Sequence, residues 1–297
     1  MANPKGIDLP KPYKERSNPQ KTQKIAFFFL FLATLLIVIP VGLVIAIIIQ
    51  KGLPAINWQF LTDMPRSGMR AGGIFPAIVG TVYLVLGAII FALPIGLLAA
   101  IYLSEYAKAN LLTRVIKLAI VNLAGVPSVV YGLFGLALFV IFLKFGVSIL
   151  AGSLTLGIMI LPIIITTSRE ALESVPQTFR EVSLSLGASK WQTIRHIVLP
   201  NAIPGILTGT ILGLGRAAGE TAPILFTVAA FYLPRLPKSL FDQAMALPYH
   251  LYVISTQVPN VHEKVRYGTA LVLLTLVLFM NLIAIIIRYQ LRKRKKW

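Results

Sequence analysis

The sequence contains no cysteine and few charged residues. Of its 297 residues, 13% are Asp, Glu, Lys or Arg, whereas soluble domains usually contain about 25%. The absence of cysteine excludes disulfide bonds and thiolate metal sites. The three histidines, His196, His250 and His262, lie far apart in the chain, so we expect no metal site and no catalytic residues. The GxxxxGK[ST] pattern of a nucleotide-binding loop is also absent, so we expect no cofactor on this chain.

Long apolar runs dominate the chain instead. Hydrophobic residues make up 57% of the sequence, and the mean hydropathy is +0.80. In a bilayer, such a chain folds as a helix bundle or as a closed β-barrel. The uninterrupted run Ile25–Ile49 excludes the barrel, because barrel strands alternate apolar and polar residues. We therefore predict an all-α integral membrane protein without a soluble domain.

Six apolar stretches are each long enough to cross a bilayer as a helix. The first contains 25 residues and is too long for a signal-peptide core, so we expect a retained span. Pro94 and Pro127 lie within the second and third spans and are expected to kink them. The predicted spans are Ile25–Ile49, Ile74–Leu103, Leu118–Leu143, Ile149–Ser168, Ile203–Leu233 and Val265–Ile287.

The basic residues predict the orientation of these spans. One set of connecting segments holds 19 of the 28 Lys and Arg residues, the other set holds eight, and Arg216 lies inside the fifth span. The positive-inside rule places the richer set, and with it both termini, in the cytosol. The net charge of +18 therefore reflects membrane borders rather than a nucleic-acid site. The richer set comprises residues 1–24, 104–117, 169–202 and 288–297.

These borders define the expected organisation of the chain. Residues 1–24 form a polar cytosolic tail, 25–49 the first transmembrane helix, and 74–287 a core of five further transmembrane helices. Residues 169–202 form a cytosolic loop within that core. Residues 288–297 form a basic tail that serves either as a stop-transfer anchor or as a contact for anionic lipid headgroups.

The loop 169–202 has the pattern of two short amphipathic helices. Ser174 and Gln177 predict a capping box for the first helix, and Ser189 and Gln192 predict one for the second. Gly187 separates the two helices as an elbow. The expected apolar faces comprise Val175, Phe179, Val182 and Leu186 in the first helix, and Trp191, Ile194 and Val198 in the second.

The spacing within this loop resembles the EAA motif of ABC-importer permeases. In that family, the three letters are followed by three residues, a glycine, nine residues and I-x-L-P. Here Glu181-Val-Ser, Gly187 and Ile197-Val-Leu-Pro200 follow the same spacing, with Val182 and Ser183 in place of the two alanines. The resemblance implies docking on a cytosolic ATPase; the alternative is a solvated loop that packs on its own bundle. The implied coupling residues are Glu181, Gly187, Ala188, Ser189, Trp191, Leu199 and Pro200.

The fifth span carries two charges, Arg216 and Glu220. Four residues apart, they lie on one face of a helix and can pair. Such charges inside a bilayer are costly. They are explained either by an anion path, in which Arg216 replaces lost hydration, or by an ion pair that fixes helix packing. Gly213, Gly215 and Gly219 leave room beside them.

Four motifs between residues 70 and 290 resemble the PstA permeases of phosphate ABC importers. They are Gly72–Thr81, Gly125–Phe134, the segment Gly215–Pro223 that contains both charges, and Leu247–Tyr252. The resemblance implies the type I ABC-importer permease fold in the cell (inner) membrane. It also implies a PstC-like second permease, a PstB-like ATPase dimer that binds ATP and Mg, and a PstS-like extracytoplasmic phosphate-binding protein.

Other functions remain open from the residues alone. A permease for another oxyanion, such as sulfate or molybdate, fits the same charged pair. An ion channel or secondary carrier also fits the pair but gives no reason for the docking loop. An intramembrane enzyme requires a nucleophile, which Arg216 and Glu220 do not provide.

Overall fold

The computed structural model describes residues 19–293, and the chain divides into two units, residues 1–49 and 50–297. Within the first unit lies most of helix α1 (Pro19–Gly52), whose large apolar side chains are exposed. The helix begins before the predicted span, because proline is preorganised for the first helical position. Residues 19–24 of the predicted tail are thus helical, and residues 1–18 lie outside the described part of the chain.

The second unit is a helix bundle with a small hairpin at one end. Strands β1 (Pro65–Arg66) and β2 (Ala71–Gly72) pair antiparallel in this hairpin. The helices are η1 (Leu53–Ala55), α2 (Trp58–Thr62), α3 (Phe75–Ile101), η2 (Tyr102–Tyr106), α4 (Leu111–Ala124), α5 (Ser128–Gly135), η3 (Leu136–Phe142), α6 (Ile149–Glu173), α7 (Gln177–Ser185), α8 (Lys190–Thr193), η4 (Ile194–Val198), α9 (Leu199–Gly219), α10 (Ala222–Thr227), α11 (Leu247–Thr256) and α12 (Glu263–Lys293).

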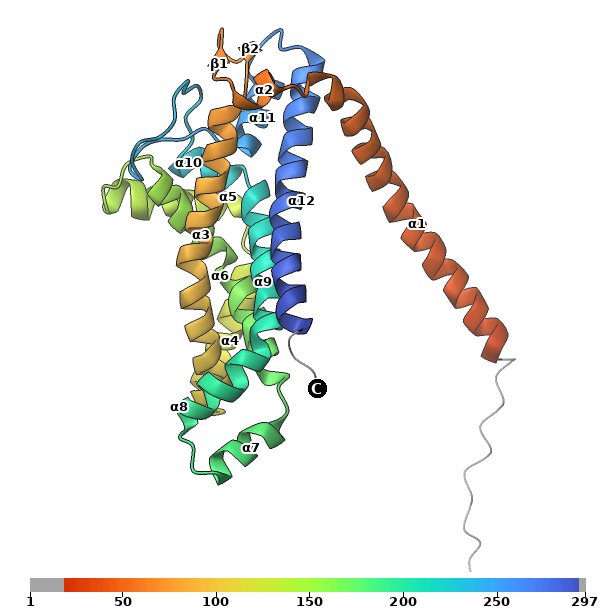
Figure 1. The fold of residues 1–297 in the computed structure, drawn as a ribbon, viewed down its shortest axis with the longest axis vertical. Helices are drawn as coiled ribbons and strands as arrows, with labels where there is room; N and C mark the ends of the chain where they lie inside the picture. Colours follow the sequence, from red (N-terminus) through yellow and green to blue (C-terminus); the bar gives the residue numbers. More distant parts are fainter. Residues whose placement is uncertain (1–18, 294–297) are drawn as a thin grey trace, which may run out of the picture. The chain divides into compact units, whose positions relative to one another are not determined.

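The centre of the bundle consists of long helices packed side by side. Helix α3 packs on α6, α6 on α9 and α9 on α12 (Figure 1). Glycines bring α3 and α6 close together: a Cβ on Gly96 would lie 2.7 Å from Ile164, and one on Gly157 would lie 2.6 Å from Phe91. Helix–helix contacts of this kind are typical of membrane proteins, where small residues allow close approach.

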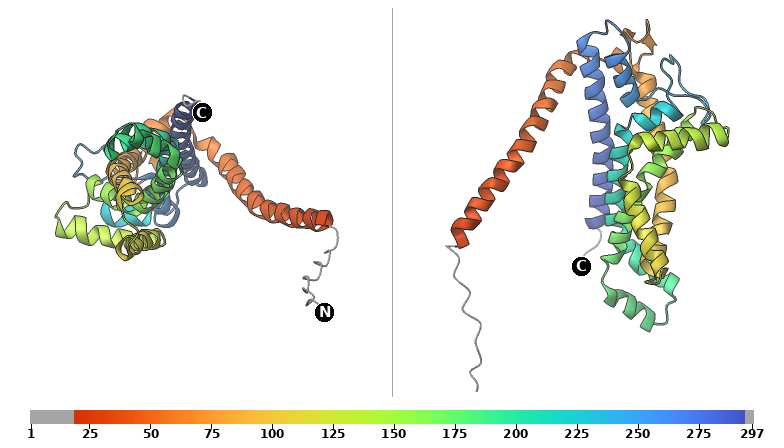
Figure 2. Two further views of the ribbon diagram at one scale, coloured as in Figure 1. Left: turned by 90° about the horizontal axis from the view of Figure 1, so that it is seen from below. Right: turned by 180° about the vertical axis from the view of Figure 1, so that it is seen from behind.

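The core contains two apolar clusters. The larger one joins α3, α6, α9 and α11 and includes Leu84, Leu156, Ile160 and Val253. The smaller one lies where α7 and α8 join the bundle and includes Leu172, Ile194 and Val198. Helices α7 and α8 lie at the end of the bundle opposite β1, β2 and α11 (Figures 1 and 2).

The outer faces of the helices are apolar. Five described helical segments are long and apolar enough to cross a membrane, or six if the bent pair α4–α5 counts as one span. Exposed side chains such as Ile90 (73%) and Leu278 (59%) continue this apolar surface over the bundle. Contiguous surfaces of this kind are unusual on soluble monomers. The chain is therefore a multi-pass membrane protein, as the composition predicted.

The predicted third span does not form a single helix. It consists of α4 and then α5 with η3, bent by 102° between them. Pro127 explains the break, because proline disfavours helical geometry in the residue before it and lacks a backbone N–H. The hydroxyl of Tyr131 donates a hydrogen bond to the Leu123 carbonyl (2.7 Å) across the bend, which fixes α5 against the end of α4.

The predicted fifth span, Ile203–Leu233, is also not one helix. Helix α9 ends at Gly219, Glu220 is extended (φ −76°, ψ 138°), and α10 is only six residues long. Pro223 cannot donate the N–H that a continuous helix would direct to the Gly219 carbonyl, and its ring would clash there. By contrast, Pro94 lies inside the continuous helix α3. Helices α3, α6 and α12 agree with the other predicted spans, and α12 continues through residue 293 of the predicted tail. Residues 294–297 lie outside the described part.

Candidate functional site

The charged pair lies at the break between α9 and α10. Arg216 belongs to the last turn of α9, and its Nε lies 3.7 Å from Oε1 of Glu220. The Arg216 side chain is 31% exposed and that of Glu220 is 18% exposed. The two charges pair as expected, but Glu220 lies beyond the helix end rather than one turn along the same helix. At 3.7 Å this is an ion pair without a close hydrogen bond.

The pair lies near mid-depth of the bundle. The Cβ position of Gly215, next to Arg216, is 3.5 Å from Nδ2 of Asn281. Asn281 belongs to the central part of α12, a helix long enough to cross a membrane. Its Oδ1 is buried without a hydrogen-bond partner among the described residues. A polar side chain of α12 therefore lies against the glycine that precedes Arg216, in an otherwise apolar bundle.

Two broken helices meet at this site. A Cβ added to Gly132 of α5 would lie 3.0 Å from the Ala222 carbonyl oxygen and 3.1 Å from Cα of Pro223. The start of α10 thus packs against α5, just past the bend. Irregular backbone at membrane depth is stable where it is buried in protein or lines a cavity, and transporters bind solutes at such discontinuous helices.

The four motifs singled out in the sequence meet in pairs. The contact of Gly132 with Pro223 joins two of them. The Leu247 N–H donates to Oγ1 of Thr81 (2.8 Å), which joins the other two by fixing the start of α11 to α3. Among the three glycines near the pair, a Cβ on Gly213 would make ordinary contacts at 3.6 Å with α6. No described atom lies within 4 Å of one on Gly219, so space remains beside Glu220.

This geometry suits an oxyanion. The guanidinium of Arg216 offers several N–H donors in a fixed plane, which matches tetrahedral and carboxylate oxygens. Its place in the last turn of α9 also aligns its charge favourably with the helix dipole. The neighbouring Glu220 carboxylate balances that charge without saturating the guanidinium donors.

The second candidate region is the loop between α6 and α9. Gly187 has φ +86°, so it forms the predicted elbow between α7 and α8. The predicted second capping box is present: Gln192 N–H donates to Ser189 Oγ (3.3 Å), and Ser189 N–H donates to Gln192 Oε1 (2.7 Å). The first capping box is wrong. Pro176 occupies the N-cap of α7, and the Ser174 hydroxyl instead donates to the Ala171 carbonyl at the end of α6 (2.8 Å).

The predicted second short helix is not separate. Helix α8 continues through the π-helical turn η4 into α9, so Leu199 and Pro200 begin the membrane helix. Proline is tolerated there because it directly follows the π-helical turn η4, and local π-helical adjustments accommodate the missing backbone N–H. The second amphipathic helix is therefore the first part of one long segment, Lys190–Gly219.

The apolar faces of the loop are divided between the bundle and the surface. Val175, Ile194 and Val198 are buried in the smaller core cluster. In contrast, large apolar side chains on both sides of the elbow are exposed: Val182 60%, Leu186 83% and Trp191 51%. Of the other predicted coupling residues, Glu181, Gly187 and Ser189 are exposed, and Ala188, Leu199 and Pro200 are half-buried.

An ion pair that the sequence did not reveal anchors this loop. Nη2 of Arg180 in α7 donates to Oε1 of Glu105 in η2 (2.7 Å) and to the Leu172 carbonyl (2.8 Å), and Nη1 donates to the Val175 carbonyl (2.6 Å). The side chains of Arg180 and Glu105 are only 12% and 8% exposed. The two residues are 75 positions apart, so spacing gave no signal. The isolated acid at the end of the second apolar run was the available clue.

His250 lies near the start of α11. It is 3% exposed, because the start of α11 is buried against the larger core. Burial lowers its pKa to about 4. The ring is therefore neutral at physiological pH.

Comparisons with known proteins agree with this architecture. The chain resembles a permease in a crystal structure of a bacterial ABC importer of alginate (TM-score 0.61, 16% identity, 93% of this chain and 100% of the other). It also resembles a chain of the inward-facing MetNI methionine ABC transporter (TM-score 0.57, 18% identity, 74% and 94% covered). The fold is thus the type I ABC-importer permease fold.

Sequence comparisons identify the family. Residues 92–297 match the model of the binding-protein-dependent transport system inner membrane component. The chain is 34% identical to a probable ABC transporter permease protein, YqgI, of Bacillus subtilis, over 90% of this chain and 95% of that protein. It is 34% identical to the phosphate transport system permease protein PstA 1 of Mycobacterium tuberculosis (92% and 89% covered). The identity is 32% to a probable PstA of Methanocaldococcus jannaschii (95% and 98% covered). The chain belongs to the family of binding-protein-dependent transport system inner membrane components and is a transport component.

Proposed function

We propose that this chain is the permease subunit of an ATP-driven importer and forms the path for inorganic phosphate together with a second permease. The observation that carries the proposal is the position of Arg216. Its partly exposed guanidinium lies at the junction of two broken helices, near mid-depth of the bundle. The names of the relatives from Mycobacterium tuberculosis and Methanocaldococcus jannaschii support phosphate as the solute.

The proposed assembly contains a PstC-like permease, a PstB-like ATPase dimer that carries ATP and Mg, and a PstS-like phosphate-binding protein. The apolar side chains Val182, Leu186 and Trp191 support a docking role for the loop. They are exposed to solvent, while the Arg180–Glu105 ion pair holds the loop against the bundle. Apolar side chains of this kind act as anchors in protein interfaces.

We further propose that the chain lies in the cell (inner) membrane with both termini and the α7–α8 loop in the cytosol. Ser67, Ser189 and Ser239 are all exposed, so cysteine at each position is accessible to a thiol reagent. Cysteines at Ser67 and Ser239 are expected to label in intact cells, and one at Ser189 only after permeabilisation. Labelling of position 189 in intact cells contradicts the orientation.

The test of the proposed function is uptake by the assembled importer in proteoliposomes that contain ATP. Radiolabelled phosphate is expected to accumulate and to resist competition by excess sulfate or molybdate. Accumulation of sulfate or molybdate without phosphate assigns the permease to another oxyanion. Uptake without ATP and without the ATPase subunit indicates a secondary carrier instead.

A further inference from the structure

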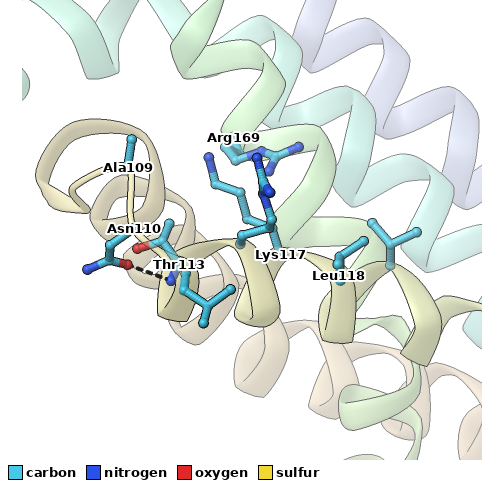
Figure 3. Close-up of a pocket in the computed structure, with 9 residues that line it drawn as sticks. Ala109, Asn110, Thr113, Lys117, Leu118 and Arg169 are labelled. Carbon is cyan, nitrogen blue, oxygen red and sulfur yellow. Dashed lines mark hydrogen bonds between the residues drawn. The ribbon is translucent and has the colours of Figure 1, made fainter.

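A basic pocket lies between α4 and α6, away from Arg216. Its volume is about 610 Å³, within the range typical of small-molecule sites. It is lined by Ala109, Asn110, Leu111, Thr113, Arg114, Lys117, Leu118, Val121 and Arg169. Figure 3 shows Lys117 of α4 and Arg169 of α6 at this pocket, with Asn110 and Thr113 along the first turn of α4.

The pocket concentrates positive charge. Arg114 and Lys117 are three residues apart on α4, so they share a face, and Arg169 reaches the same space from α6. None of the described lining residues is acidic. Like charges that line one pocket repel one another, and a bound anion relieves that repulsion.

One of the three cations has unused hydrogen-bonding capacity. Arg169 is paired with Glu173 at 3.7 Å, yet its Nε is buried without a hydrogen-bond partner among the described residues. The Arg169 side chain is only 20% exposed, so burial restricts its access to solvent. This Nε faces the Glu173 carboxylate, whereas Arg169 also lines the pocket, where its other guanidinium N–H groups can meet an oxyanion.

The start of α4 adds backbone donors to the site. Asn110 caps this helix by accepting a hydrogen bond from Thr113 N–H (2.8 Å). The other N–H groups of a first helical turn have no partner within the helix, and the helix dipole makes that end positive. Helix starts of this kind bind phosphate groups when cations are also present.

The position of the pocket indicates which class of ligand can reach it. Arg169 lies near the end of α6, just before α7, so the pocket lies toward the α7–α8 end of the bundle. In the proposed orientation this is the cytosolic border of the membrane. Basic pockets between transmembrane helices at that border bind anionic headgroups.

We propose that Arg114, Lys117, Arg169 and the first turn of α4 form a binding site for a phosphate group, separate from Arg216. The group belongs either to the headgroup of an anionic lipid or to free inorganic phosphate. The site does not depend on which solute the permease carries.

The lipid source is tested on the purified importer assembly in nonionic detergent. Phosphatidylglycerol or phosphatidylcholine is titrated in, and binding is read by native mass spectrometry. The double substitution Arg114→Gln with Lys117→Gln is expected to weaken phosphatidylglycerol binding about thirtyfold and to leave phosphatidylcholine binding unchanged. The control Lys108→Gln removes a nearby exposed cation that does not line the pocket, and it is expected to change binding less than about twofold.

The free-phosphate source is tested without anionic lipid. Line broadening of inorganic phosphate in ³¹P NMR is measured in an Arg216→Gln background, which weakens phosphate binding in the proposed solute path. The same double substitution is expected to abolish the broadening, whereas exchange of Arg114 for Lys and Lys117 for Arg is expected to keep it.

The outcomes separate the two sources and can reject both. Loss of lipid selectivity alone assigns the site to a headgroup, and loss of phosphate broadening alone assigns it to the free ion. Binding that is equal in the parent and the double variant, or absent from the parent in both experiments, overturns the site. Thermal unfolding of the double variant checks folding, and Arg114 is exposed and Lys117 half-buried.

Discussion

Two of the three arginine–glutamate pairs among the described residues have opposite characters. The pair Arg180–Glu105 is short (2.7 Å), nearly buried, and completed by two backbone carbonyls. The pair Arg216–Glu220 is long (3.7 Å) and more exposed, and it lies at a break between helices. The first arginine has its donors occupied by the protein, whereas the second keeps donors for another acceptor. Burial and donor saturation, rather than the presence of a charge pair, separate a structural anchor from a candidate ion site.

Disruption of the Arg180–Glu105 pair is expected to have the largest effect on stability. Glu105→Ala leaves the Arg180 charge buried and unpaired, which costs about 3–5 kcal/mol when a buried pair loses one partner. We expect a clear fall in thermal stability and faster hydrogen exchange across α7 and α8. The exposed pair Arg66–Asp63 (3.3 Å) provides the control, since Asp63→Ala should cost at most about 1 kcal/mol. Equal small effects at the two sites contradict the anchoring role.

Acid is not a selective way to compare the two pairs, because the buried His250 also responds to pH. Burial holds its pKa at about 4, below the ordinary value of 6.5. Between these values the unfolded chain binds a proton that the folded chain does not, so stability falls as the pH drops from about 6.5 to about 4. The full loss is about 3 kcal/mol.

Unfolding midpoints measured over this pH window check the expectation. His250→Leu is expected to flatten the pH dependence between 6.5 and 4, because it removes the buried base. An unchanged dependence in that variant assigns the effect to other groups.

Substitutions in the Arg216–Glu220 pair are expected to affect transport more than stability. Arg216→Gln removes a charge-assisted contact worth about 1.5–3 kcal/mol, so phosphate uptake should fall roughly tenfold or more. Assembly with the second permease should persist, because glutamine keeps much of the length of the arginine side chain. Glu220→Gln should also impair uptake, since the unpaired arginine then holds the anion too tightly or moves away.

Exchange of the two residues decides between transport and packing. In Arg216→Glu with Glu220→Arg, a packing pair keeps its attraction, whereas a site that needs its cation at one depth fails. Glu at the end of α9 opposes the helix dipole by up to about 1 kcal/mol, so the amount of assembled protein must be measured alongside uptake. Uptake near that of the parent means that the pair only packs.

The sequence predicted the features that depend on local pattern. Hydropathy located the long helices, the Ser189–Gln192 spacing predicted a real capping box, and four-residue spacing predicted the Arg216–Glu220 pair. An apolar run does not show where a chain turns inside a membrane, so the break near Pro223 was missed. At Pro127 a kink was expected, and the structure has a bend of 102° between two separate helices.

Long-range contacts were out of reach for the same reason. The anchor of Arg180 on Glu105 and the meeting of Arg169 with α4 depend on helices brought together only by folding. Spacing reports neighbours within one helix and carries no information on residues 75 positions apart.

Substitutions of Gly187, the elbow between α7 and α8, are expected to have the smallest effect on stability. Gly187 has φ +86°, so leucine there is strained by about 1–2 kcal/mol, although no described atom lies within 4 Å of an added Cβ. Asparagine accepts this conformation more readily, so Gly187→Asn separates backbone strain from contact with a docked ATPase. Gly42→Ala, in a helix with similar open space, is the control without a left-handed backbone, and it should not lower stability.

Pull-down of the ATPase and uptake are the two measurements for these variants. If docking needs close approach at the elbow, both Gly187→Leu and Gly187→Asn should lose the ATPase while the helices remain inserted. If only backbone geometry matters, Gly187→Asn should retain it. Normal uptake by a well-expressed Gly187→Leu variant removes the docking role of the elbow and leaves the Arg180 anchor as a purely structural contact.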